Sequence, residues 1–231
     1  MKLNKIIPKF QPLYLLIKKV KYAWMARKFG KTSNAIFQTA STTFFNRHPD
    51  LFSVLQKISP DQSAQRILSF GSSTGEECQS LRLYFPQSKI VGAEINADSR
   101  EQAIQSNSDR NIEFIDSVIE LIHSKGPYDV VFALSVLCKN PEAEYLESIA
   151  SIYPFHVYND LIEKLDSAIK PGGYLVIRSS NYRFRDTSVF GKYQVIEDAL
   201  LREPIIFPKF DKNSNRLRDY LDKEEIFKKM R

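Results

Sequence analysis

The sequence is poor in cysteine and contains no long apolar run. Its two cysteines, Cys78 and Cys138, are too few among 231 residues for a disulfide framework. Their positions predict reduced thiols, and no metal site is expected. No apolar stretch approaches the length of about 20 residues that a membrane-spanning helix requires. Residues 13–17 are too few for the core of a signal peptide. These absences favour a cytoplasmic protein.

Acidic residues are missing from the first 49 positions, which carry ten lysines and arginines. The whole chain has 33 basic and 27 acidic residues, so residues 50–231 hold 23 basic against 27 acidic side chains, a net charge of −4. The basic character therefore belongs to the N-terminus. We expect residues 1–60 to form a basic helical extension that precedes a domain of residues 61–231.

Apolar residues recur at helical spacing among these lysines and predict an amphipathic helix. They are Leu13, Leu16, Ile17, Val20, Trp24 and Met25. In one interpretation the helix packs this stripe on the domain and leaves its lysines in solvent. In the other, the arm contacts an anionic membrane surface or, less favoured, nucleic acid.

Length and pattern favour a single α/β domain, since 231 residues with 43% hydrophobic content can bury a full core. Short apolar runs predict strands at residues 66–70, 90–94, 112–115, 128–134 and 174–177. Helical stretches are expected at residues 50–58, 76–85, 98–106, 118–123 and 157–169. This alternation predicts a doubly wound, mostly parallel sheet. Residues 195–201, 205–210 and 226–230 would add a helix and an antiparallel hairpin that closes the sheet.

A glycine turn joins the first predicted strand to the first helix of this alternation. Gly71 and Gly75 let the backbone approach a ligand, the helix start offers free N–H groups, and Glu94 after the second strand can accept hydrogen bonds from ribose hydroxyls. The spacing is not that of a GxGxxG dinucleotide fingerprint, and no Gly-Lys-Ser/Thr follows that would make a P-loop. The alternative is an ordinary strand-to-helix turn, but Glu94 favours a cofactor site.

At these residues the sequence resembles class I S-adenosylmethionine-dependent methyltransferases. Within that group, Ser-Thr-Gly-Glu-Glu at 73–77 resembles the methionine-binding turn of the chemotaxis-receptor glutamate methyltransferases. Their Thr-x-Phe-Phe-Arg segment is matched in part by Thr43, Phe45, Arg47, Pro49 and Phe52, with Asn46 in place of one phenylalanine. The resemblance covers roughly residues 42–180. It implies a seven-stranded Rossmann-like sheet and S-adenosyl-L-methionine as the cofactor.

The resemblance also implies the cofactor-binding residues, namely Gly71, Ser72, Ser73, Gly75, Glu76, Glu94, Ile95, Asp116 and Ser135. Asp116 would bind the adenine amino group, although capping of the following helix is an equal alternative. Ser69 stands where many of these enzymes carry an acid on the first strand. The ammonium group of the cofactor therefore needs another anion, and of the Glu76–Glu77 pair we favour Glu76. The alternative role of both is to stabilise the helix N-terminus.

The acceptor site is expected where the fourth and fifth strands end. The long connection at residues 139–160 predicts a lid or acceptor-binding loop. His156 is the candidate general base, with a loop histidine of no catalytic duty as the alternative. Arginines favour an anionic acceptor bound by forked hydrogen bonds, or else surface salt bridges. The predicted catalytic residues are His156, Arg47 and Tyr182, and the predicted acceptor-binding residues are Arg183, Arg185 and Tyr153.

The function expected is methyl transfer to a small molecule or a protein side chain, with a carboxylate as the nearest analogy. Residues 134–138 read Leu-Ser-Val-Leu-Cys and not the Asn-Pro-Pro or Asp-Pro-Pro motif associated with methylation of base amino groups. One alternative is an RNA or other nucleic-acid methyltransferase or binding protein that uses the basic arm. Another is a non-catalytic S-adenosylmethionine binder.

Overall fold

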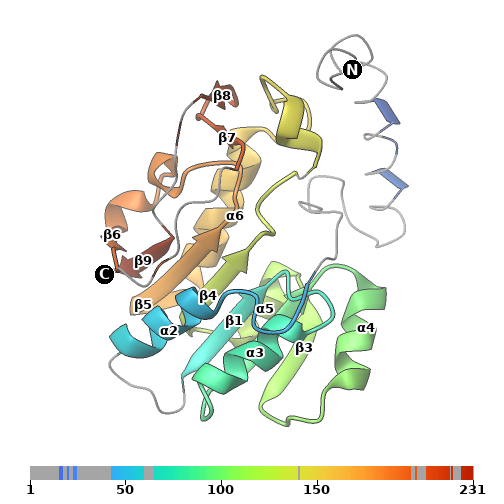
Figure 1. Cartoon of the computed structure of the whole chain (residues 1–231), viewed down its shortest axis with the longest axis vertical. Helices are drawn as coiled ribbons and strands as arrows, with labels where there is room; N and C mark the ends of the chain where they lie inside the picture. The colour runs from blue at the N-terminus through green and yellow to red at the C-terminus, as the bar shows by residue number, and fades with distance from the viewer. Residues whose placement is uncertain are drawn as a thin grey trace.

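Seven strands form one sheet in the order β3-β2-β1-β4-β5-β9-β6 in a computed structural model (Figure 1). The structure describes residues 16, 17, 20, 23, 24, 43–59, 65–139, 141–198, 201, 207–218, 220 and 225–230. The strands are β1 (Arg66–Phe70), β2 (Lys89–Glu94), β3 (Ile112–Asp116), β4 (Tyr128–Leu134), β5 (Ile169–Arg178), β6 (Tyr193–Ile196) and β9 (Ile226–Lys229). Strands β1 to β5 are parallel, and β9 is antiparallel to both β5 and β6. The predicted doubly wound, seven-stranded sheet is confirmed.

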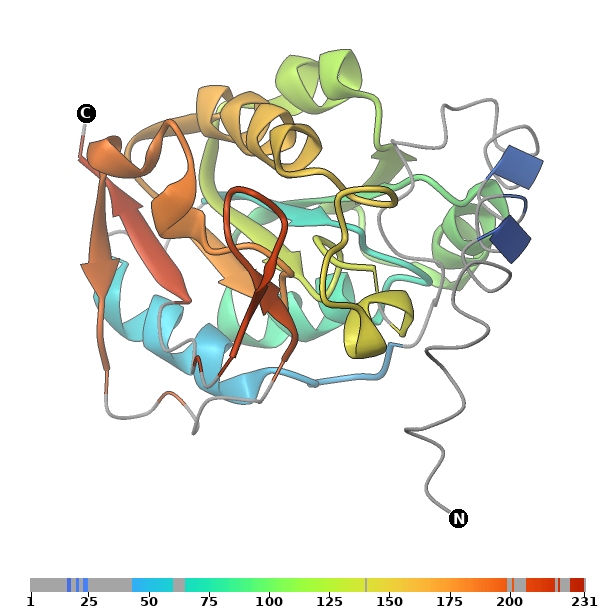
Figure 2. The same cartoon turned by 90° about the horizontal axis from the view of Figure 1, so that it is seen from above.

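Helices cover both faces of this sheet (Figure 2). One core contains α2 (Pro49–Ile58) and α3 (Glu76–Tyr84), and the other contains α5 (Ile119–Lys125) and α6 (Phe155–Ser167). Successive residues of a strand point to opposite faces. Ile67 and Val130 therefore join the first core, whereas Leu68 and Val131 join the second. The continuous apolar runs of β1 and β4 reflect burial on both sides.

Helix α2 belongs to the packed domain and not to an extension. Pro49 stands in its first turn, where a missing N–H costs nothing. Its apolar face is at most 1% exposed, and consists of Leu51, Phe52, Val54 and Leu55. Residues 49–58, predicted as the end of the N-terminal extension, therefore pack in the core of the domain. The arm that precedes it is described only at residues 16, 17, 20, 23 and 24, which are helical; Leu13 and Met25 lie outside the described residues.

The segment before α2 is tied to α3 through Asn46. The N–H group of Asn46 donates to Ser80 Oγ at 2.7 Å, and its Oδ1 accepts from the hydroxyl of Tyr84 at 2.9 Å. Its φ of 53° lies in the left-handed region, which asparagine tolerates better than bulky residues. A phenylalanine could not accept the bond from Tyr84, so asparagine has a structural role at this position.

The C-terminal part differs in detail from the prediction. Residues 195–196, expected in a helix, end β6, and β5 begins at Ile169, before the Pro-Gly-Gly sequence expected to precede it. The closing antiparallel pair of β6 and β9 is confirmed. A second, two-stranded sheet consists of β7 (Lys209–Phe210) and β8 (Arg216–Leu217). Among the described residues, no helix is long and apolar enough to cross a membrane.

A buried arginine joins three parts of the chain at the end of β5. Arg178 is 2% exposed, and its guanidinium binds Asp50 in a bidentate pair at 2.9 and 2.6 Å. It also donates to both carboxylate oxygens of Glu225, and its Nη1 lies 3.3 Å from Nδ1 of His48. Burial alone would lower the pKa of Arg178, but the hydrogen bonds to Glu225 and Asp50 outweigh it and raise the pKa. This cation therefore ties α2 and the start of β9 to the sheet.

Replacing Arg178 by methionine should lower the free energy of unfolding by about 3 kcal/mol or more, because two largely buried carboxylates lose their common cation. Denaturant unfolding monitored by circular dichroism measures this loss. The matched control is Arg218→Met, since the Arg218–Glu147 pair is 74% and 71% exposed and should contribute about 1 kcal/mol at most. Equal effects of the two substitutions would show that Arg178 is not a structural tie.

Candidate functional site

The turn between β1 and α3 lies at the carboxyl ends of the parallel strands. Gly71, Ser73 and Gly75 have φ values of 81°, 50° and 98°. A Cβ atom added to Gly71 would lie 2.4 Å from Cγ2 of Val136, and one added to Gly75 would lie 2.8 Å from Cζ of Phe114. Both positions therefore need glycine for backbone conformation and for space. The turn brings its backbone against the loop that follows β4.

Glu94, the last residue of β2, holds this turn from the neighbouring strand. Its Oε2 accepts a hydrogen bond from the N–H of Ser73 at 2.8 Å, and its Oε1 accepts from the N–H of Asn96 at 2.7 Å. The residue is 8% exposed. Burial raises the pKa of Glu94, although the backbone hydrogen bonds from Asn96 and Ser73 oppose that shift. With Ile95, three backbone N–H groups bind the carboxylate, which has about four acceptor positions and therefore keeps capacity for a ribose hydroxyl. Ile95 follows as a bend that leads into α4 (Ala97–Ser106).

Asp116 ends β3 at the same level, since it is the register partner of Glu94. Arg100 of α4 connects the two strand ends, because its Nη1 donates to the carbonyl oxygen of Glu94 at 2.7 Å and its Nη2 lies 3.8 Å from Oδ2 of Asp116. The N-cap of α5 is Val118, and no side chain caps this helix. Asp116 therefore does not cap α5, which was the alternative to a role in cofactor binding. It remains a candidate to bind the adenine amino group.

An anion stands beside Ser69, but it is Glu77. Oγ of Ser69 donates to Oε1 of Glu77 at 2.8 Å, whereas Glu76 accepts from the hydroxyl of Thr74 within the turn at 2.7 Å. Burial raises the pKa of Glu77 to about 7, against the opposing effects of the Ser69 hydrogen bond and the positive charge of Arg47. The structure thus favours Glu77 over Glu76 as the partner of a cofactor ammonium group.

The residues of this edge fit S-adenosylmethionine. The buried Oγ of Ser72 has no hydrogen-bond partner among the described atoms, so the turn has a hydroxyl available to a ligand. A Cβ atom added to Gly92 of β2 would lie 2.8 Å from this Oγ atom of Ser72. Any larger residue at position 92 would therefore fill the space beside the Ser72 hydroxyl. Carboxylates at the ends of β2 and β3 can bind ribose and adenine, and Glu77, in the first turn of α3 beside Ser69 of β1, can bind an ammonium group.

The connection predicted as a lid is held in place by the β7–β8 hairpin, and we call residues 141–153 and 207–218 together the cap (Figure 1). The backbone N–H of Ile149 donates to the carbonyl oxygen of Ser214 at 3.0 Å, and the backbone N–H of Arg216 donates to the carbonyl oxygen of Glu147 at 2.8 Å. The Arg216 guanidinium also donates to the carbonyls of Ala143, Glu144 and Leu146, at 2.8, 2.5 and 2.8 Å. The cap lies beyond the carboxyl ends of β4 and β5, and Ser135 begins the loop that leads to it, with a φ of 58°.

Two tyrosines predicted at the acceptor site belong to the core. Tyr153 and Tyr182 are 1% and 0% exposed, and their ring centroids are 5.4 Å apart. The hydroxyl of Tyr182 lies 2.5 Å from the carbonyl oxygen of Tyr153 and 2.7 Å from Oγ of Ser214. Burial raises the pKa of Tyr182 to about 12. These positions do not support the predicted catalytic role of Tyr182 or an acceptor contact by Tyr153.

The other predicted acceptor-site and catalytic residues on the β5 side are paired or exposed. Arg183 forms a bidentate pair with Asp186, at 2.6 and 2.8 Å, which is the salt-bridge alternative. Arg185 is exposed in a 3-10 turn, and His156 is exposed in the first turn of α6. Arg47 lies near the turn, because its positive charge lowers the pKa of Glu77.

Lys139, which the sequence patterns did not single out, is buried where the β4 loop meets the cap. It is 2% exposed, and its Nζ lies 5.8 Å from the ring centroid of Tyr153. The backbone N–H of Lys139 donates to Oδ1 of Asn181 at 2.6 Å. Burial lowers the pKa of Lys139 to about 7, although the charge of Glu142 opposes the shift. No spacing or motif distinguishes this lysine from the exposed ones.

Residues 45–210 match the methyltransferase domain family, which is more than half of the chain. The chain belongs to this family. This membership supports the predicted enzyme class, an S-adenosylmethionine-dependent methyltransferase, and the predicted cofactor. No curated protein sequence matches the chain.

Solved structures of methyltransferases resemble parts of the chain. The plantazolicin methyltransferase BpumL in complex with a triazolic desmethylPZN analog and S-adenosylhomocysteine is 15% identical, with 55% of this chain and 43% of that one covered and a TM-score of 0.41. PKMT2 from Rickettsia typhi is 17% identical, with 59% of this chain and 26% of that one covered and a TM-score of 0.44. CalS10, an amino pentose methyltransferase from Micromonospora echinaspora, is 16% identical, with 67% of this chain and 58% of that one covered and a TM-score of 0.45. The chain thus spans from about a quarter to somewhat more than half of the lengths of these proteins.

The affinity for S-adenosylhomocysteine should fall about tenfold for each pH unit below about 7, because Glu77 must lose its proton to bind an ammonium group. Above that pH the carboxylate is already ionised, and this contribution to the pH dependence ends. Calorimetry in buffers of different ionisation enthalpy would measure both the affinity and the proton released. Glu77→Gln should weaken binding and remove the pH dependence.

The matched control is Glu76→Gln, which should keep the pH dependence because Glu76 is bonded within the turn. A Glu77→Gln protein with the same affinity and the same pH profile as the unmodified protein would assign the ammonium site to another group.

Proposed function

We propose that this methyltransferase acts on a carboxylate, carried by a small molecule or by a protein side chain. The proposal rests on the proximity of Arg47 to Glu77 beside the glycine turn, where the positive charge of Arg47 lowers the pKa of that carboxyl against the larger effect of burial. Its guanidinium carbon lies 5.6 Å from the ring centroid of Phe44, and the residue is only partly buried. A guanidinium binds carboxylates through two parallel hydrogen bonds, which orients the acceptor.

The surroundings of the three histidines also support a carboxylate acceptor. His48 is buried beside Arg178, His123 lies 3.0 Å from the carbonyl oxygen of Lys164, and His156 is exposed on α6. An alcohol or a protonated amine must lose a proton to become a nucleophile, whereas a carboxylate is already ionised at neutral pH. Positioning alone can then supply most of what the protein contributes. His156 is accordingly not part of the proposed mechanism.

Bound S-adenosylmethionine supplies a methyl group activated by sulfonium, and its transfer forms one carbon–oxygen bond as one carbon–sulfur bond breaks. In the proposed site Glu94 accepts hydrogen bonds from ribose, Asp116 from the adenine amino group, and Glu77 from the ammonium group. Arg47 holds the acceptor carboxylate. The cap limits the access of water from the ends of β4 and β5.

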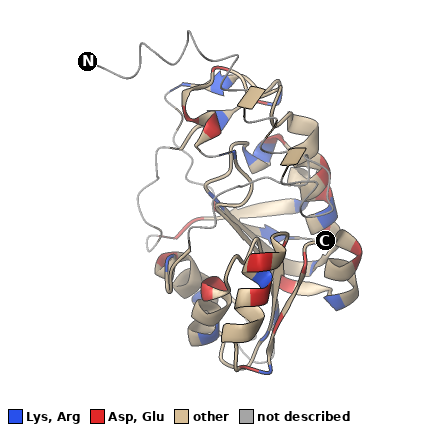
Figure 3. Ribbon diagram, turned by 90° about the vertical axis from the view of Figure 1, so that its right-hand side faces the viewer, with Lys and Arg blue, Asp and Glu red and all other residues tan. Residues whose placement is uncertain are grey.

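Two features bear on the other candidate functions. The resemblance of residues 73–77 to the chemotaxis-receptor glutamate methyltransferases supports a carboxylate. Over the described domain, basic and acidic residues are interspersed (Figure 3), and residues 50–231 carry a net charge of −4. Such a surface gives little support to a nucleic-acid substrate, whose phosphates require a basic patch. If the protein binds the cofactor but methylates no acceptor, the alternative of a non-catalytic S-adenosylmethionine binder would be favoured.

Arg47→Lys should raise KM for the acceptor by about tenfold or more, because lysine cannot reproduce the forked hydrogen bonds to a carboxylate. The affinity for S-adenosylhomocysteine should stay within about twofold, since the positive charge near Glu77 is kept. The acceptor is found by incubating the enzyme and labelled S-adenosylmethionine with carboxylic acids, amines, RNA and protein extracts. Label on a carboxylate is released as methanol by alkali.

Arg183→Lys is the matched control and should leave KM unchanged, because Arg183 is paired with Asp186. Label that resists alkali would contradict a carboxylate acceptor, and label on RNA would favour the nucleic-acid alternative. An unchanged KM in Arg47→Lys would remove Arg47 from the acceptor site.

A further inference from the structure

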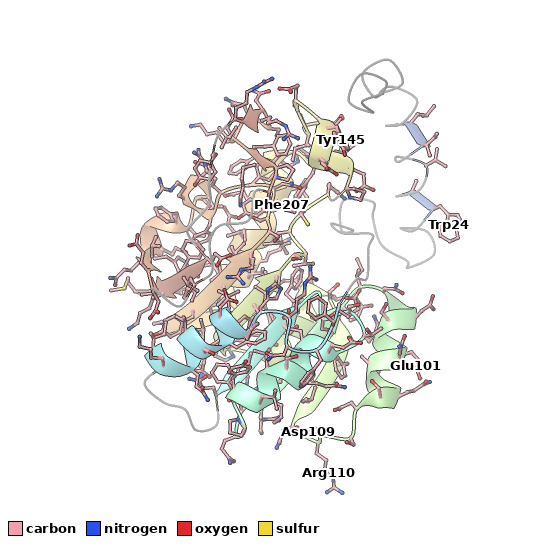
Figure 4. The ribbon with its side chains drawn as sticks, viewed as in Figure 1. Trp24, Glu101, Asp109, Arg110, Tyr145 and Phe207 are labelled. Atoms are coloured by element: carbon pink, nitrogen blue, oxygen red, sulfur yellow. The ribbon has the colours of Figure 1, made fainter. Side chains whose placement is uncertain are left out.

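The described part of the N-terminal arm presents an apolar stripe, which we define as Leu16, Ile17, Val20 and Trp24. These side chains are 58%, 57%, 62% and 63% exposed, and Trp24 projects away from the domain (Figure 4). Positions i, i+1, i+4 and i+8 share one face of a helix. The stripe is therefore one continuous apolar face, and the interpretation that it packs on the domain is wrong for these residues.

Elsewhere on the described chain the adjacent Phe44 and Phe45 are 57% and 52% exposed, but no described helix outside the arm presents more than one large exposed apolar side chain. Leu83, Ile104 and Leu121 are 58%, 47% and 42% exposed, but they lie on three different helices, α3, α4 and α5. Single exposed apolar side chains are ordinary on protein surfaces, whereas a continuous apolar face marks a contact with a partner or a membrane. The stripe is thus the feature that needs an occupant.

The charge of the arm identifies the kind of occupant. Residues 1–31 contain nine lysines and arginines and no acidic residue, and Lys18, Lys19 and Lys21 stand among the residues of the stripe in the sequence. A second copy would bring the same positive charge against this one. A nucleic acid would satisfy the lysines and leave the stripe in water. An anionic lipid surface satisfies both, because apolar side chains enter the acyl boundary while lysines meet the headgroups. Tryptophan also favours the boundary between lipid and water.

We propose that the N-terminal arm docks on an anionic lipid bilayer, with the apolar stripe in the lipid boundary and the surrounding lysines on the headgroups. Neither attraction suffices by itself, because stable attachment of a peripheral protein usually requires a hydrophobic and an electrostatic contribution together. Each lysine near the surface should strengthen binding about fivefold at low salt. That contribution fades as the Debye length shortens. Docking is independent of the acceptor and would keep the enzyme at a membrane surface.

Trp24 is the sole tryptophan of the chain, so its fluorescence reports on the stripe directly. The full chain is titrated with vesicles of phosphatidylcholine and phosphatidylglycerol, with vesicles of phosphatidylcholine alone, and with RNA. The anionic vesicles should shift the Trp24 emission to shorter wavelength, and the protein should sediment with them. Phosphatidylcholine alone should give neither result, and added salt should weaken the binding.

The Leu16→Ser, Ile17→Ser, Val20→Ser triple variant keeps Trp24 as the fluorophore. Its affinity for anionic vesicles should fall by about a hundredfold or more, since three apolar side chains no longer enter the lipid. The matched control, Leu83→Ser with Ile104→Ser and Leu121→Ser, removes three exposed apolar side chains from the domain and should bind as the unmodified protein does. The Lys18→Gln, Lys19→Gln, Lys21→Gln variant should lose binding to a similar extent.

Three results would overturn the proposal. The first is an absence of sedimentation and of an emission shift with anionic vesicles. The second is binding of RNA that the apolar triple variant retains, which would assign the arm to nucleic acid. The third is a shift that depends on protein concentration and not on lipid, which would assign the stripe to a second copy of the chain.

Discussion

The carboxylate of Glu94 is the contact on which the cofactor edge of this protein depends. Parallel strands deliver their carboxyl ends to one edge, and the turn after β1 contains three residues with positive φ. Glu94 binds the N–H of Ser73 in that turn and the N–H of Asn96 before α4, and so connects two adjacent crossovers. A buried carboxylate is stable only when it is hydrogen-bonded. The turn and the acid therefore stabilise each other, and the same oxygens remain open to a ribose.

The sheet divides the remaining tasks between its two halves. The half built from β1, β2 and β3 presents acids at its ends, which suits a ligand with hydroxyl, amino and ammonium groups. The other half carries the cap beyond β4 and β5, and Arg178 ties β5 to α2 and to the residue before β9. Arg47 immediately precedes the part of the chain that Arg178 anchors through His48 and Asp50. The buried cation thus contributes to the position of the arginine proposed to hold the acceptor.

The sequence predicted the elements well because burial on both faces leaves long apolar runs in β4 and short ones in β1, and because glycine marks a turn that other residues cannot make.

The sequence-based prediction failed where the answer depends on how an element is rotated or what packs on it. Glu76 and Glu77 are adjacent in sequence, and the rotation of α3 decides which one meets Ser69. Tyr153 and Tyr182 follow strand ends, as ligand-binding aromatics do, but the cap buries them. Arg183 resembles an acceptor ligand until Asp186 is seen beside it. The apolar stripe of the arm reads in sequence like any helix that packs on a core, and its exposure alone distinguishes it.

A crystal structure of the protein with S-adenosylhomocysteine tests the central assignment most directly. The account predicts ribose hydroxyls within hydrogen-bond distance of the Glu94 carboxylate, the adenine amino group beside Asp116, and the amino group of the ligand beside Glu77. The backbone of the Gly71 to Gly75 turn should lie against the ligand. A ligand bound elsewhere, or one whose ribose makes no contact with Glu94, would contradict the assignment of this edge as the cofactor site.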